Sequence, residues 1–280
     1  MGGFFVLCKR GDQMSERLIV HKLPDYDYIE LYPVADFHDG DPKTDEAIFK
    51  NFVKYISAAE NRYWLYAGDN LNNAIKSSVS NVYNEKRSPH EQKEHFIELV
   101  KPIADKCLCF IPGNHEVRSA KESDCQLVWD IACRLVGDEK ARELYRENEA
   151  FLKISCGRCK DKSRSWGDPV TYVGWIHHGV GGGMYAGATV NKFQLRTMAI
   201  EGLDFAVQGH VHKGKIGHKF DVRSIDPRNN MVLQREILNV ICCAWSDFGG
   251  YGARGMMLPG HKGPSCIVLN GRRKEATTII

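Results

Sequence analysis

The chain has 280 residues, of which 43% are hydrophobic and 10% aromatic, and this content excludes a disordered protein. Its 38 basic and 35 acidic residues give a net charge of +3, which is too balanced to indicate nucleic-acid binding from charge alone. No run of the sequence approaches the roughly 18 apolar residues that a membrane-spanning helix needs.

The beginning of the chain is expected to form an N-terminal arm, 1–25, followed by a single domain, 26–280. The apolar start of the arm has no basic residue before it and meets basic residues too early for a signal peptide. With ten cysteines and no secretory segment, the sequence favours reduced thiols and a cytoplasmic protein. Cys156 and Cys159 have C-x-x-C spacing, but a four-ligand zinc site needs a second pair, so their role stays open.

The first strand is predicted over 28–35, where an apolar, tyrosine-rich run ends at Asp36 and His38. These two residues are two positions apart, and the alternation of a strand would place both side chains on one face of the strand end. Residues 44–59 have apolar residues at helical spacing and fill the connection to a second apolar run, 63–67. A helical crossover predicts that these two strands are parallel.

A turn follows the second strand at Gly68, and Asp69 comes directly after it. Ser88 with the proline after it is typical of the start of a helix. A third apolar run, 107–111, then leads through a Pro-Gly turn to Asn114. The sequence therefore predicts a polar residue at the end of a third strand as well.

Farther along, the charged segment 119–150 has helical spacing, and strand-like runs follow at 170–177 and 203–208, with a helix predicted at 192–201 between them. Beyond the second of these strands the pattern changes. Three stretches alternate like strands of a second, antiparallel sheet: 215–223, 231–240 and 265–269.

Histidines end both of these strands. The strand of 170–177 ends at His177, which is therefore the expected functional residue of the pair, with His178 as the alternative. The next strand is followed by His210 and His212. Five strands thus each deliver a polar side chain at the carboxyl end, which is where open α/β sheets place their sites.

Carboxylate oxygens and imidazole nitrogens are ligands for manganese, iron, zinc or cobalt rather than for ions that prefer thiolates. One carboxylate can bridge two cations, and Asp69, from the middle of the set, is the natural bridge. Two cations roughly 3.5–4 Å apart can clamp the attacking and leaving oxygens of a phosphoryl transfer and lower the pKa of a shared water.

The order of these motifs resembles the calcineurin-like metallophosphoesterase family, whose pattern reads DxH, GD, GNH[ED], H, GHxH. The matching motifs of this chain are Asp36-Phe37-His38, Gly68-Asp69, Gly113-Asn114-His115-Glu116, His177-His178 and Gly209-His210-Val211-His212. The overall look is similar to compact bacterial or phage-type members. The resemblance implies an α/β fold, namely a two-sheet sandwich flanked by helices (α/β/β/α).

The resemblance also implies a dinuclear metal site. One ion would take Asp36, His38, Asp69 and His212, and the other would take Asp69, Asn114, His177 and His210. Manganese is the expected metal, with iron, zinc, cobalt or nickel as alternatives.

By the same resemblance His115 binds no metal and lies near the leaving oxygen, as an acid or electrostatic stabiliser, with Asn114 beside it. In the phosphoprotein phosphatase branch an aspartate pairs with this histidine, whereas this chain has Asn72, which we expect to orient His115 and contact substrate. That branch also has arginine where this chain has Pro112, so a protein phosphatase is disfavoured. Arg118 could contact a substrate phosphate as a fork donor; a solvated surface arginine is the alternative.

The expected function is a metal-dependent phosphoesterase that uses metal-activated hydroxide, as a phosphodiesterase or nuclease-like enzyme. A phosphomonoesterase or nucleotide phosphatase on the same site is the alternative, and a non-catalytic binding protein with the same fold is the alternative of another class. The expected partners are a phosphate ester, nucleic acid or nucleotide, and no membrane; the oligomeric state is left open.

Overall fold

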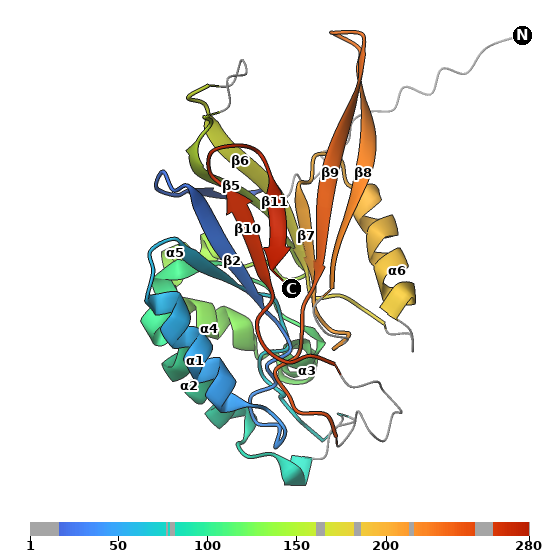
Figure 1. The fold of residues 1–280 in the computed structure, drawn as a ribbon. Coiled ribbons are helices and arrows are strands. Elements are labelled where there is room, and N and C mark those ends of the chain that lie inside the picture. The colour runs from blue at the N-terminus through green and yellow to red at the C-terminus, as the bar shows by residue number, and fades with distance from the viewer. Residues whose placement is uncertain are drawn as a thin grey trace, which may run out of the picture.

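Two mixed β-sheets pack face to face, and helices cover their outer faces (Figure 1). The computed structural model describes residues 17–76, 78, 82–160, 166–181, 186–212, 216–249 and 260–279. This architecture confirms the expected α/β sandwich of two sheets flanked by helices. None of the helices in the described ranges combines the length and apolar character needed to cross a bilayer.

The first sheet has the strand order β11-β10-β2-β3-β4. Its strands are β2 (Tyr28–Val34), β3 (Arg62–Tyr66), β4 (Cys107–Phe110), β10 (Cys266–Asn270) and β11 (Ala276–Ile279). β2, β3 and β4 are parallel, as the helical crossover predicted. β10 pairs antiparallel with the free edge of β2, where Ile267 lies opposite Leu31. The prediction that the stretch 265–269 belongs to a second, antiparallel sheet is therefore wrong.

The second sheet has the strand order β1-β5-β6-β7-β9-β8. Its strands are β1 (Ile19–Lys22), β5 (Glu149–Arg158), β6 (Pro169–His177), β7 (Phe205–Gln208), β8 (Ile216–Asp226) and β9 (Met231–Ile241). β6, β7 and β9 are parallel neighbours, whereas β5 and β8 pair antiparallel with β6 and β9. β1 pairs with β5, so part of the expected N-terminal arm, 19–22, is a strand of this sheet.

Helices connect the strands, and side chains cap the first turns of α1 and α2. They are α1 (Glu46–Ser57), α2 (Pro89–Val100), α3 (Asn114–Ser123), α4 (Leu127–Val136), α5 (Asp138–Leu144) and α6 (Ala186–Met198), with the short 3-10 helices η1 (Val82–Asn84) and η2 (Lys101–Lys106). The Asp45 carboxylate accepts the first free amide of α1, from Ile48. Ser88 and Glu91 form a capping box at the start of α2, which confirms the predicted helix start.

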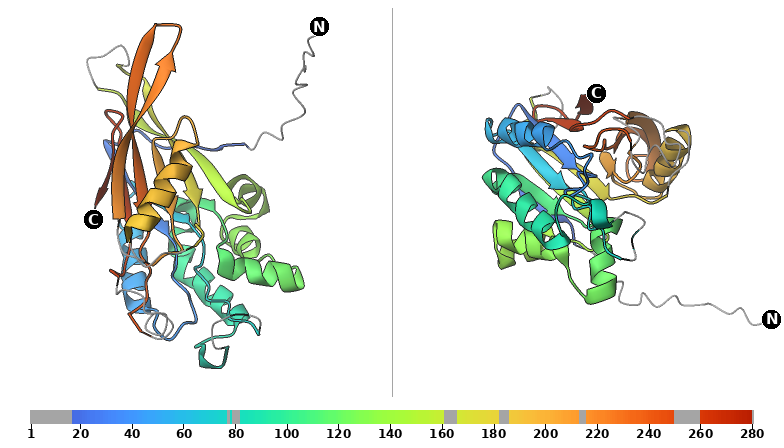
Figure 2. Two further views of the ribbon diagram at one scale, coloured as in Figure 1. Left: turned by 90° about the vertical axis from the view of Figure 1, so that its right-hand side faces the viewer. Right: turned by 90° about the horizontal axis from the view of Figure 1, so that it is seen from below.

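Two buried clusters hold the layers together. The larger lies between the sheets and under α1 and α2, where the rings of Phe37 and Phe49 stack at 4.0 Å and Trp245 meets Phe49 edge-on at 4.9 Å. The smaller lies under α6 and contains Trp175 and Phe193. In Figure 2, viewed from below, α6 and the α1–α5 group lie on opposite sides of the sheets. The core therefore fixes the relative positions of the strand ends that carry the site.

The hairpin of β8 and β9 extends beyond the rest of its sheet (Figures 1 and 2). Its outer part has exposed apolar side chains: Ile225, Met231, Val232 and Leu233. The site lies at the other end of the sheets, next to α3.

Candidate metal centre

The loops that carry the candidate ligands have an uncommon backbone conformation. The residues with positive φ include Asp36 (56°), His38 (52°), Asp69 (53°), His210 (72°) and His212 (50°). Such left-handed conformations are strained for side chains other than glycine and concentrate at functional sites. β2 ends at Val34, so the first two of these residues lie beyond the strand, and the turn rather than strand alternation aims them.

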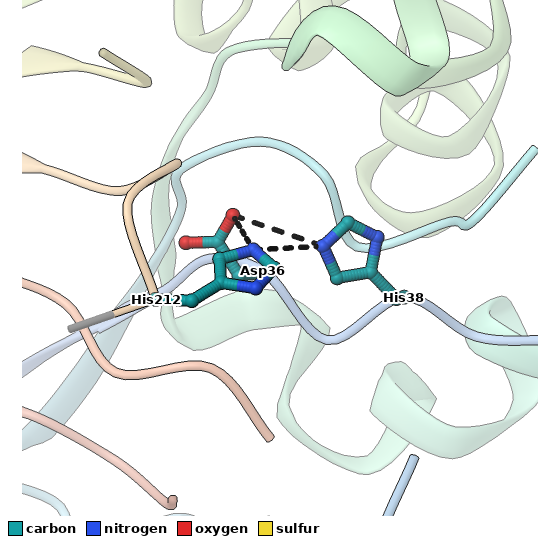
Figure 3. Close-up of side chains that lie close together, drawn as sticks. All are labelled: Asp36, His38 and His212. Carbon is teal, nitrogen blue, oxygen red and sulfur yellow. Dashed lines mark hydrogen bonds and ion pairs between the residues drawn. The ribbon is translucent and has the colours of Figure 1, made fainter. Parts of the chain in front are cut away.

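The first group of converging side chains is Asp36, His38 and His212 (Figure 3). His212 Nε2 lies 3.1 Å from both Asp36 Oδ1 and His38 Nε2. His38 Nε2 lies 3.9 Å from the same carboxylate oxygen. The other carboxylate oxygen, Asp36 Oδ2, accepts a hydrogen bond from the His210 amide at 2.8 Å. Two β-strands from different sheets thus contribute to one small group of ligand atoms.

The second group is Asp69, His178 and His210. His178 Nε2 lies 3.0 Å from Asp69 Oδ2 and 4.0 Å from Asp36 Oδ1. His210 Nδ1 lies 2.7 Å from the side-chain oxygen of Asn114, so the asparagine reaches this group from the first turn of α3.

The structure corrects the expectation that His177 rather than His178 joins the site. His177 Nδ1 accepts a hydrogen bond from the Gly179 amide at 2.7 Å, and its ring lies 5.6 Å from that of Trp175, on the α6 side of the sheet. His178 is the next residue, so its side chain leaves the chain on the opposite side, between the sheets. Its Nδ1 donates to the Ala67 carbonyl at 2.9 Å, which turns Nε2 towards Asp69.

His115 forms a third group of converging side chains with His38 and Asp69, which belong to the first and second groups. Its Nε2 is 3.8 Å from Asp69 Oδ2, and its ring centroid is 4.5 Å from that of His38. Its Nδ1 lies 2.7 Å from the main-chain carbonyl of Asn72, and this contact assigns the proton to Nδ1 and leaves Nε2 towards the cluster. The Arg118 guanidinium is next to the same ring, with Nη1 at 3.4 Å from Nδ1.

The structure also corrects the role expected for Asn72. Its side chain is buried, and its amide donates to Glu85 Oε1 at 2.7 Å instead of reaching His115 or the cluster. Only the main-chain oxygen of Asn72 contacts His115. The expectation that the Asn72 side chain orients the ring and contacts substrate is therefore wrong, because another carboxylate holds that amide.

Glu116 is the structural centre of the loop that carries Asp69, a role the sequence did not suggest. Its buried carboxylate accepts five hydrogen bonds, at distances from 2.7 to 3.1 Å. The donors are the Tyr66 hydroxyl and the amides of Asp69, Asn70, Leu71 and Gly113. Burial and the charge of Asp69 raise the pKa of Glu116, whereas the donors stabilise its anion.

The start of α3 adds a further contact to Asp69. The His115 amide in the first turn donates to Asp69 Oδ1 at 2.7 Å. The positive end of the helix dipole therefore faces this carboxylate. Gly113 has no room for a side chain, since a Cβ would lie 2.1 Å from Asp69 Oδ1.

The buried carboxylates and two of the histidines have opposite charges, and each shifts the pKa of the other. Burial acts to raise the pKa of Asp69, but the charge of His178 outweighs it and holds the pKa well below its usual range. The pKa of His178 is raised to about 10, because the negative charges of Asp69 and Asp36 outweigh the effect of its burial. The same competition raises the pKa of His212, whose partner is Asp36.

The other imidazoles are held neutral. Burial, together with the nearby charge of His212, lowers the pKa of His38 well below its ordinary value. Burial also lowers the pKa of His115 and of His210. The cluster therefore combines carboxylate oxygens with imidazole nitrogens, of which those of His38, His115 and His210 are held neutral, and carboxylate with imidazole is a donor set that suits a divalent transition metal.

One ring nitrogen fits a cation better than it fits the protein. Among the described residues, the buried His178 Nε2, which faces the cluster, has no hydrogen-bond partner. His178 Nε2 is close to Asp69 but not aligned for a hydrogen bond. Within the described part of the chain, the groups of side chains able to hold an ion do not include Cys156 or Cys159.

The sequence pattern of the calcineurin-like phosphoesterases matches residues 32–214, which is more than half of the chain and contains every residue of both groups. The chain belongs to the calcineurin-like phosphoesterase family. A crystal structure of the calcineurin-like phosphoesterase YfkN from Bacillus subtilis is similar to this phosphoesterase over 90% of each chain, at 11% sequence identity and a TM-score of 0.40. No curated protein matches the sequence of this phosphoesterase. It is a metal-dependent phosphoric ester hydrolase with a candidate His/Asp metal site.

Proposed function

We propose that this phosphoesterase cleaves phosphodiesters, in the manner of a phosphodiesterase or nuclease, with two divalent cations and preferably manganese. The observation that carries the proposal is the position of Asp69. Its carboxylate belongs to a group with His178 and His210, and also to a group with His38 and His115. With His115 set aside as a residue that binds no metal, Asp69 is still shared between His38 and the pair of His178 and His210, and a carboxylate shared in this way suits a bridged pair of cations.

Seven side chains are proposed as ligands. One cation would be held by Asp36, His38, Asp69 and His212, and the other by Asp69, Asn114, His178 and His210. When bound, such cations act as Lewis acids and lower the pKa of water. Loading also replaces the protons that His178 and His212 hold against the carboxylates, so occupancy should increase with pH.

The catalytic work of the protein groups follows from their hydrogen bonds. Asp69 is fixed by the His115 amide, so its unshared oxygen keeps one direction. His115 has Nδ1 tied to a carbonyl, so any proton that it holds or delivers towards a leaving oxygen is at Nε2. Asn114 supports developing charge from the first turn of α3, where the helix dipole is positive.

Charge supports a diester as the substrate. A phosphodiester carries one negative charge near neutral pH, and Arg118 provides one permanent cation next to His115. A phosphomonoester or nucleotide has a second negative charge and is the alternative substrate class for the same ligands. The number of cysteines remains the support for a reducing, cytoplasmic location.

A substrate panel with added manganese tests the proposal. The panel contains an aryl phosphodiester, an aryl phosphomonoester and single-stranded DNA, and purified protein is assayed for bound metal in parallel. Hydrolysis of the diester and the DNA above that of the monoester supports the proposal, whereas preference for the monoester selects the alternative. Absence of both bound transition metal and manganese-stimulated hydrolysis would sink it.

Asp69→Asn is the matched variant. It keeps the shape of the side chain but removes the charge shared by the two groups, so turnover should be lost for every substrate. A binding protein that merely keeps the fold would retain its affinity for partners in this variant.

A further inference from the structure

The direction of the His115 ring depends on one main-chain carbonyl. His115 Nδ1 is 2.7 Å from the oxygen of Asn72, and no carboxylate of the described chain takes that position. A carbonyl can aim the ring only as well as its own peptide is fixed. What holds residue 72 therefore decides where His115 Nε2 points.

Glu85 holds Asn72. Its Oε1 accepts from the Asn72 side-chain amide at 2.7 Å, and the Asn72 main-chain amide donates to the Asp39 carbonyl at 2.9 Å. The other oxygen, Oε2, accepts from Gln92 Nε2 at 3.1 Å. Both oxygens of this half-buried carboxylate are thus used to fix neighbours.

Gln92 extends the same support to the main chain of His115. This glutamine is fully buried, and its Oε1 accepts from the Asn73 amide at 2.8 Å. The Asn73 side chain in turn donates to the His115 carbonyl at 2.6 Å. Glu85 and Gln92 together therefore fix the ring of His115 through residue 72 and its backbone through residue 73.

The side chains of Glu85 and Gln92 are closely packed against the loop at Gly40. A Cβ added at Gly40 would lie 2.2 Å from Gln92 Nε2 and 2.8 Å from Glu85 Oε2. The Lys86 amide also donates to the Gly40 carbonyl at 2.8 Å, which clamps the chain after Glu85 to the loop that follows His38.

We propose that Glu85 is a positioning residue for His115, acting through the Asn72 amide, and that it supplies from 13 residues farther along the chain the carboxylate that residue 72 lacks. The role rests on the proposed function, because it matters for catalysis only if His115 acts on a leaving oxygen. Glu85 contacts no candidate ligand, so its loss should change the direction of His115 and leave metal binding intact.

The test exchanges the two partners. In Glu85→Gln, the side chain has a single acceptor oxygen for the two amide donors of Asn72 and Gln92. In Asn72→Asp, two carboxylates are brought into contact. The double variant N72D/E85Q restores a hydrogen bond with the donor and acceptor reversed, and it also returns an acceptor to Gln92. Glu91→Gln is the control, since it removes a carboxylate from the start of α2 whose partners are on Ser88.

We expect each single variant to lower kcat for an unactivated diester by roughly 10- to 100-fold, the usual cost of losing a group that orients a functional histidine. The loss should be smaller for an activated aryl ester, KM and metal content should be unchanged, and the double variant should recover most of kcat. Equal losses for both esters, no recovery in the double variant, or an E85Q enzyme as active as wild type would overturn the proposal.

A second readout does not depend on activity. Nitrogen NMR of the His115 ring in the metal-free protein reports which nitrogen carries the proton. We expect the Nδ1–H form in wild type and E91Q, a smaller population of it in each single variant, and recovery in the double variant. An unchanged ring in E85Q refutes the positioning role even if wild type hydrolyses nothing, whereas inactivity of wild type alone refutes the proposed function.

Discussion

His178 provides the sharpest test of the site, because its neighbour His177 is a matched control. His178 is buried against Asp69, and its pKa is raised to about 10. One unit of pKa difference corresponds to about 1.4 kcal/mol, so the difference from the ordinary 6.5 corresponds to about 5 kcal/mol of stabilisation in metal-free protein. Loss of one partner from a buried ion pair typically costs about 3–5 kcal/mol, which agrees.

The pH dependence has a definite sign. Because folding raises the pKa of His178, its contribution is complete below pH 6.5 and is lost as the pH rises towards about 10. His178→Ala should therefore lower the free energy of unfolding of the chelated protein most at pH 6, and the deficit should shrink at pH 9. His177→Ala removes one hydrogen bond to the Gly179 amide and should cost about 1 kcal/mol.

Urea denaturation of both variants at the two pH values, with metal content measured before chelation, checks these expectations. His178→Ala should bind less metal than wild type and lose turnover, whereas His177→Ala should retain both. Equal metal loss in the two variants, or a stability deficit of His178→Ala that does not change with pH, would refute the assignment.

Four other perturbations have distinct outcomes. His115→Ala should keep both metals and lower kcat by roughly 10²- to 10⁴-fold, less for substrates with good leaving groups, as metal analysis and a leaving-group series would show. Glu116→Gln leaves amide donors facing an amide and should cost roughly 2–6 kcal/mol in urea denaturation. Gly113→Ala forces Asp69 to move and should reduce metal content, whereas Gly187→Ala, where a Cβ meets nothing within 4 Å, should not. Burial raises the pKa of Glu85 to about 7, so its contribution to stability is lost between its ordinary pKa of 4.5 and pH 7; Glu85→Gln should flatten this part of a Tm-against-pH curve.

The strands that carry the site could be read from the sequence because each is an apolar run that ends in a turn and a polar residue. β2, β3, β4, β6 and β7 all follow that rule. Strand pairing could not be read in the same way. β10 joins β2 across more than 200 residues of chain, and nothing local in its alternating pattern distinguishes one sheet from the other. β5, in contrast, alternates between buried and less buried residues, so its sequence does contain the signal of a strand.

Within the site, the position of His177 at the end of its strand predicted the wrong histidine, because the direction of the side chain decides which of the two joins the cluster. His177 is the last residue of β6, but it shares the outer face of the sheet with Trp175, whereas Ile176 belongs to the core between the sheets. Alternation carried one step further predicts that His178 faces that core. The link from Glu85 to Asn72 had no such signal, because the two residues are brought together only by the packing of α2 against the loops.

The five hydrogen bonds of Glu116 also affect how relatives of this phosphoesterase should be compared. The ligands make the chemistry, but the carboxylate of Glu116 shapes the turn on which one of them is carried. A relative that no longer hydrolyses phosphate esters can lose its metal-ligating side chains and still depend on an acidic residue at this position to fold. Retention of that acidic residue alone is thus a poor sign of activity, and a survey of active and inactive relatives should weigh the aspartates and histidines instead.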